Sequence, residues 1–90
     1  MRFESLTSYE RSLKKLDREI KNKAKIAINK YVDFFEGGHR PKGLGLRRLS
    51  RHIWKIRVDL RVVFRIEGDL VRWGLVGDHD DIKRFLKHFD

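Results

Sequence analysis

The sequence predicts an α+β fold, in which a small antiparallel β-sheet of three to four strands packs on an N-terminal helical pair and a short C-terminal helix follows. Two patterns predict it: residues 7–36 carry apolar side chains at helical spacing, and residues 53–66 alternate between apolar and mostly charged side chains. The length of 90 residues leaves room for one sheet with one or two helices. We therefore expect a single domain over residues 1–90.

The first part of the chain predicts a strand and then helices. Residues 2–6 suit a short first strand, and Thr7 with Glu10 three residues later fits a capping box. The apolar residues that then recur at helical spacing are Leu13, Leu16, Ile20, Ala24, Ala27, Ile28, Tyr31 and Phe35. We expect one long helix or a helical hairpin bent near Leu16-Asp17, and Gly37-Gly38 should end it.

Residues 53–66 predict two strands joined by a hairpin. The even-numbered residues are apolar, namely Trp54, Ile56, Val58, Leu60, Val62, Phe64 and Ile66, and most odd-numbered ones are charged, namely Lys55, Arg57, Asp59, Arg61 and Arg65. Because successive strand residues point to opposite faces, we expect the even residues to pack against the helices of residues 8–36 and the odd residues to form a cationic face. A single strand of this length would span roughly 46 Å, so the run should fold back. A three-residue loop over 58–60 keeps the parity and pairs Arg57 with Arg61.

The segment after this hairpin predicts a third strand and the last helix. Residues 67–69 form the next turn, and a two-residue loop of Gly68 and Asp69 reverses the parity. The residues that then join the core are Val71, Trp73 and Leu75, and those that share the charged face are Leu70 and Arg72. Residues 77–81 close the sheet and open a helix, whose apolar stripe is Ile82, Phe85, Leu86 and Phe89.

The charge of the chain is concentrated in one segment. The net charge is +9, and residues 40–65 hold nine Lys/Arg against one acid, a local excess of +8. Like charges placed opposite each other in a sheet are destabilising, so a polyanion or an acidic protein is the expected partner. There is no cysteine, which excludes disulfides and thiolate zinc sites. No leader or long apolar run appears, so we expect a cytoplasmic location and no membrane contact.

Three short motifs in this order resemble the RelE/ParE superfamily of bacterial toxins: Trp54-Lys55-Ile56-Arg57, then Asp59-Leu60-Arg61-Val62-Val63-Phe64, then Val76-Gly77-Asp78-His79 followed by Asp81-Ile82. The predicted order of elements is also that of the family. Resemblance to the RelE-like branch implies the toxin of a type II toxin–antitoxin system, a ribosome-dependent mRNA endonuclease that inhibits translation and needs no metal or cofactor. It implies a cognate antitoxin protein, the ribosome and mRNA as partners. The alternative is a ParE-like inhibitor of DNA gyrase without nuclease activity.

The resemblance also implies a catalytic site made of Lys55, Arg57, Arg61 and His79. Lys55 and Arg57 match a basic pair on the family's second strand, Arg61 matches an arginine on its third, and His79 matches a catalytic histidine or arginine after the last strand. These residue types suit RNA cleavage by its own 2′-OH, because arginine forks bind phosphate and histidine exchanges a proton near neutral pH. Which residue is the acid and which the base stays open. Further nucleic-acid contacts are expected from Arg47, Arg48, Arg51, Arg65 and Lys83.

Overall fold

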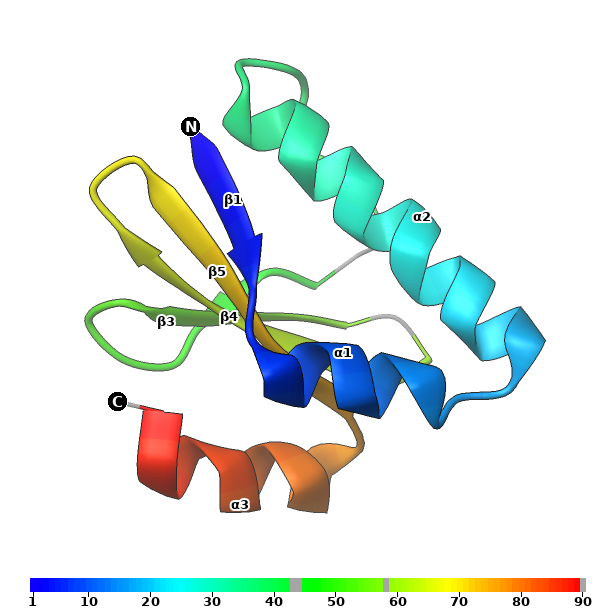
Figure 1. Ribbon diagram of the computed structural model, residues 1–90. Coiled ribbons are helices and arrows are strands. Elements are labelled where there is room, and N and C mark those ends of the chain that lie inside the picture. Colours follow the sequence, from blue (N-terminus) through cyan, green and yellow to red (C-terminus); the bar gives the residue numbers. More distant parts are fainter. Residues whose placement is uncertain (43–44, 58, 90) are drawn as a thin grey trace.

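The structure, a computed structural model, describes residues 1–42, 45–57 and 59–89. Within these residues a five-stranded mixed sheet carries helices on both faces (Figure 1). The elements in chain order are β1 (Arg2–Ser5), α1 (Thr7–Lys14), α2 (Arg18–Phe35), β2 (Arg47–Arg48), β3 (Ile53–Arg57), β4 (Arg61–Glu67), β5 (Leu70–Gly77) and α3 (His79–Phe89). The predicted α+β class and element order are confirmed. The sheet has five strands and not three to four, because the two-residue β2 adds to one edge. The expected first strand, β1, lies at the other edge and pairs parallel with β5, so the sheet is mixed and not purely antiparallel, in the order β1-β5-β4-β3-β2.

The N-terminal helical segment is a hairpin and not one long helix. α1 ends at Lys14, and Asp17 starts α2 by accepting a hydrogen bond from the Ile20 amide at 3.0 Å. The expected capping box at Thr7 is wrong. The Leu6 amide still donates to Trp73 of β5 (2.9 Å), so Leu6 is the extended residue before the helix and Thr7 is already helical. No helix of the described residues is long and apolar enough to cross a membrane.

The hairpin of β3 and β4 follows the predicted parity. Arg57 lies opposite Arg61, which confirms the three-residue loop, although Val58 lies outside the described residues. Ile56, Val62 and Phe64 are fully buried. They join the main core with residues of α1 and α2, such as Tyr9, Ala24, Ile28 and Tyr31, whereas Trp54, Leu60 and Ile66 are partly buried at its margin.

The opposite face of the sheet is only partly cationic. Ile53 and Val63 have the odd parity of Lys55 and Arg57, yet both are buried. They form a second small core with Ile82 of α3, and the partly buried Phe85, Leu86 and Phe89 pack against it. α3 therefore covers one part of this face, and Lys55, Arg57 and Arg61 lie beside it on what we call the cationic half of the sheet.

Because β5 has a bulge at Gly74, the prediction that Leu75 joins the main core is wrong. Val63 pairs with Leu75 but Phe64 pairs with Trp73, so the register shifts by one residue between them. Val71 and Trp73 enter the main core as predicted, whereas Leu75 turns to α3 and Val76 takes the core position. A Cβ at residue 74 would lie 2.9 Å from the rings of both Phe85 and Phe89. The absent side chain thus lets α3 approach the sheet closely.

Candidate active site

A cavity of about 280 Å³ lies where the cationic half of the sheet meets α3. Four predicted site residues line it: Lys55 from β3, Arg61 from β4, and His79 and Lys83 from α3. Its other lining residues are apolar, namely Leu49, Ile82 and Leu86. Basic groups from three elements therefore converge beside an apolar floor, where electrostatic interactions are stronger than in open water.

The sheet register explains why Arg61 and His79 meet. Arg61 is the first residue of β4 and lies opposite Gly77, the last residue of β5. His79 follows two residues later as the first residue of α3 and is exposed to solvent. On its other side Arg61 faces Arg57 of β3, which is also exposed. The strand register therefore places Arg57, Arg61 and His79 at one end of the sheet.

Lys55 stands in an unusually cationic environment. It lies opposite Arg47 of β2 in the antiparallel register and is half-buried. Burial lowers the pKa of the Lys55 ammonium group, and the positive charges of Arg61, Arg47 and Arg57 lower it further. This ammonium group thus releases its proton more easily than an ordinary lysine does.

The turn that carries His79 is held by two carboxylates. Asp78 accepts a hydrogen bond from the Asp81 amide at 2.8 Å, and Asp81 accepts one from the Asp78 amide at 3.1 Å. The Asp81 amide is the main cause that lowers the pKa of the Asp78 carboxyl group. Arg84 forms an ion pair with Asp81. A Cβ at Gly77 would come within 2.6 Å of the Asp81 side chain, so this tight start of α3 requires glycine there.

The other predicted site residues fall into two groups. Arg47 and Arg57 extend the cationic half of the sheet beside Lys55 and Arg61, although neither lines the cavity. Arg51 is exposed in the turn between β2 and β3. Arg47 and Arg57 thus add positive charge beside the cavity, whereas Arg51 lies at the other end of β3 from Arg57.

Arg48 and Arg65 have structural contacts. Arg48 donates to the carbonyl groups of Ser50 (3.0 Å) and Arg51 (2.7 Å), and its guanidinium carbon lies 5.7 Å from the Trp54 ring centre. Arg65 is partly buried, pairs with Glu67 and donates to the carbonyl group of Phe89 at 3.2 Å. Arg65 thereby ties the C-terminal end of α3 to the sheet.

Sequence reasoning missed the apolar side of this cavity. The sequence predicts the apolar stripe of α3. It does not predict that this stripe packs on the face of the sheet that carries Lys55 and Arg57. Ile53 and Val63 were the available signal, because both are apolar at odd positions of an otherwise charged face. Across the described residues, no three His, Cys, Asp or Glu side chains gather as a metal site would require.

Comparison with known proteins shows the fold. No family model and no curated protein matches the chain. A chain of the RelB-RelE antitoxin-toxin complex from Methanococcus jannaschii superposes with a TM-score of 0.71 at 16% identity, over 94% of this chain and 98% of that one. A metal-bound toxin from Helicobacter pylori superposes with a TM-score of 0.70 at 14% identity, over 91% of this chain and 98% of that one. The chain therefore has a RelE-like toxin fold.

Proposed function

We propose that this chain is the toxin of a type II toxin–antitoxin system and that it inhibits translation by cutting mRNA on the ribosome. One observation carries the proposal: Lys55, Arg61 and His79 come from three elements and line one cavity on a RelE-like fold. Among the residues that the structure describes, neither Lys55 nor Arg61 has an ion-pair partner. Such cations, next to a group that exchanges protons, suit a reacting phosphodiester. Ribosome and messenger also make the cytoplasm the place of action.

The proposed reaction is attack of the RNA 2′-OH on the adjacent phosphorus. A base removes the 2′-OH proton, the 2′-oxygen bonds to phosphorus, and the bond to the 5′-oxygen breaks as that oxygen receives a proton from an acid. The products are a 2′,3′-cyclic phosphate and a 5′-hydroxyl end. No electron acceptor or metal ion is required to balance this step.

Arg61 is suited to stabilise the phosphate as charge develops on it. Its guanidinium group presents several N–H donors in a planar fork, which matches two phosphate oxygens. Arg57, directly opposite in the register, contributes a second positive charge at the same end of the sheet. Arg47 and Arg51 are suited to hold the flanking phosphates.

Lys55 and His79 are the two groups suited to exchange protons. Histidine does so near neutral pH by its nature. For Lys55 the lowered pKa brings its proton exchange closer to that range. Both line the same cavity, so one can act on the 2′-oxygen and the other on the 5′-oxygen.

We also propose a cognate antitoxin as the resting partner. The Methanococcus jannaschii neighbour was crystallised as an antitoxin-toxin complex. The excess charge of residues 40–65 would bind RNA indiscriminately if it stayed uncovered.

The test is induced expression of the chain in growing bacteria, with primer extension on a translated reporter message and analysis of the new RNA ends. We expect growth arrest, cuts only in translated message, and 5′-hydroxyl products. If growth stops while the message stays intact and gyrase is trapped on DNA, the nuclease proposal is wrong and the chain acts as a ParE-like gyrase inhibitor.

A further inference from the structure

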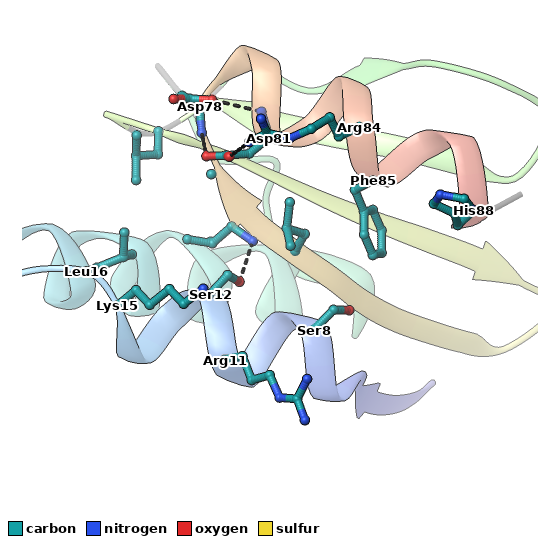
Figure 2. Close-up of a pocket in the computed structure, with 14 residues that line it drawn as sticks. Ser8, Arg11, Ser12, Lys15, Leu16, Asp78, Asp81, Arg84, Phe85 and His88 are labelled. Atoms are coloured by element: carbon teal, nitrogen blue, oxygen red, sulfur yellow. Dashed lines mark hydrogen bonds and ion pairs between the residues drawn. The ribbon is translucent and has the colours of Figure 1, made fainter.

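A second hollow of about 550 Å³ lies between α1 and α3, and we call it the α1–α3 groove (Figure 2). Its lining on α3 includes Asp81, Arg84, Phe85 and His88, whereas the Lys55 cavity is lined by other residues of that helix, such as His79 and Leu86. The two hollows therefore lie against different sides of α3. None of the residues that line the groove belongs to the proposed cleavage site.

The edge of β5 that borders the groove is already hydrogen-bonded. β1 pairs with β5 only as far as Trp73. Beyond it, the Ser8 hydroxyl donates to the Gly74 carbonyl at 2.7 Å, and the Ser12 hydroxyl accepts from the Val76 amide at 3.0 Å. Figure 2 shows Ser12 of α1 turned toward this strand. An added β-strand would have to displace these contacts, so the groove does not suit an extended peptide.

The groove combines an apolar floor with a basic rim. Its apolar lining includes Leu16, Leu60, Leu75 and Phe85, and Figure 2 shows Phe85 reaching from α3 toward α1. The cationic and titratable basic residues in its lining are Arg11, Lys15, Arg84 and His88. In the part of the chain that the structure describes, neither Arg11 nor Lys15 has an ion-pair partner.

The polar groups in the groove do not suit a small polar ligand or RNA. Small-molecule sites present convergent polar groups that are free to bind. Here the Ser8 and Ser12 hydroxyls bind backbone, and the carboxylates of Asp78 and Asp81 bind each other's amides. The apolar floor offers no partner to RNA phosphates, whereas apolar side chains of a protein helix can pack against it.

We propose that the α1–α3 groove docks an acidic, amphipathic helix of the cognate antitoxin while α3 stays in place. This deepens the proposed function and rests on it for the identity of the partner. Apolar side chains of such a helix would fill the floor, and its carboxylates would face Arg11 and Lys15. The docked segment would then lie on the helix that carries His79 without entering the Lys55 cavity.

The first test maps binding by amide chemical shifts of the labelled protein. The probe is a synthetic helical peptide with leucines on one face and glutamates on the other. We expect shifts along α1 and the groove side of α3, and a glutamine version of the peptide should bind about tenfold more weakly. A map centred on the Lys55 cavity, or an RNA oligonucleotide that shifts the groove amides, would overturn the proposal.

A matched pair of double variants tests the charges. Arg11→Glu with Lys15→Glu reverses the rim, and Lys21→Glu with Lys25→Glu makes the same charge change on α2, outside the groove. The rim variant should lose at least about tenfold in peptide affinity, because each rim charge contributes to the docked state. An equal loss in the α2 variant would mean nonspecific charge attraction and would contradict docking in the groove.

The second test uses the product of the gene adjacent to this one, co-expressed as the antitoxin. The rim variant should arrest growth as the wild type does, yet the adjacent product should no longer restore growth. Restored growth in the rim variant would overturn the proposal. If the wild type itself fails to arrest growth, the proposed function fails, and the peptide map still decides whether the groove binds an acidic helix.

Discussion

Arg61 of β4 lies directly opposite Gly77 of β5, and this pairing brings an arginine to the end of the strand from which the turn to His79 leaves. Arg61 and His79 then line the same cavity as Lys55. The relationship depends on backbone register and not on a side-chain contact. Substitution of either side chain should therefore remove chemistry without removing the arrangement of the strands.

We predict that Arg61→Ala abolishes mRNA cleavage on translating ribosomes and leaves the fold intact. The reason is the loss of the fork-like donor that stabilises the phosphate as charge develops on it. The measurements are primer extension on a reporter message and a thermal unfolding curve. Lys87→Ala is the matched control, because it removes an exposed cation of α3 that does not line the cavity. Equal loss of cleavage in both variants would indicate a general charge effect.

We predict that His79→Ala slows cleavage by a factor on the order of 100 or more, the usual effect of losing a general acid or base. The measurement is the single-turnover rate on programmed ribosomes as a function of pH. His88→Ala is the control, since His88 lies on the groove side of the same helix. A His79→Ala rate equal to that of the wild type would mean that the nuclease does not use His79 as its general acid or base.

Much of the fold was predictable because alternation and turn chemistry act locally. The pairing of Arg57 with Arg61 was predicted from the alternation of apolar and charged residues. The same alternation places Lys55 on the cationic face with them. Gly68 and Asp69 likewise form the predicted two-residue turn, with Gly68 at a φ of +59°. These features depend only on neighbours in sequence.

The rest could not be predicted because it depends on contacts distant in sequence. The bulge at Gly74 lies against the rings of Phe85 and Phe89, which are distant in sequence, and no local pattern marks residue 74 as an extra residue. The failed capping box at Thr7 has a similar cause, since the Leu6 amide is held by Trp73 of β5. The apolar floor of the cavity follows from where α3 docks, which periodicity alone does not specify.

Lys55 should make stability depend on pH in the alkaline range. Its pKa in the folded protein lies below the ordinary value of 10.5. Between the two values the unfolded chain binds more protons than the folded one, so the free energy of unfolding should rise with pH across that window. Below the window both states are protonated, and the cost of burying the Lys55 charge acts fully, together with its repulsion from Arg61 and Arg47.

The variant Lys55→Met tests this dependence. It removes the repelled charge, so it should raise the melting temperature at neutral pH and flatten the rise toward alkaline pH. The measurement is thermal unfolding at a series of pH values, and Lys87→Met is the control on an exposed site. A melting temperature below that of the wild type at neutral pH would contradict the repulsion argument.

Two aromatic residues that lie opposite each other in the hairpin of β3 and β4 should differ in their contribution to stability. Phe64 lies opposite Trp54 in the register, but Phe64 is fully buried and Trp54 only partly so. We predict that Phe64→Ala costs about 3–5 kcal/mol of unfolding free energy, as expected for a truncated core aromatic. Trp54→Ala should cost less, because part of its ring is already in water. Denaturant unfolding measures both, and an equal or larger cost for Trp54 would contradict the burial pattern.

Gly74→Ala should destabilise the protein and impair cleavage at the same time. The added methyl group would meet the rings of Phe85 and Phe89 at 2.9 Å, so α3 must move outward, at a cost of about 1–3 kcal/mol typical of overpacking. Because α3 also carries His79, the displacement should slow cleavage although residue 74 does not line the cavity.

Gly45→Ala is the matched control, since the nearest atom to its Cβ would be 3.9 Å away. Denaturant unfolding and reporter cleavage should both be altered in Gly74→Ala and nearly unchanged in Gly45→Ala. A destabilised Gly74→Ala protein that cleaves at the wild-type rate would mean that the site does not depend on how closely α3 docks.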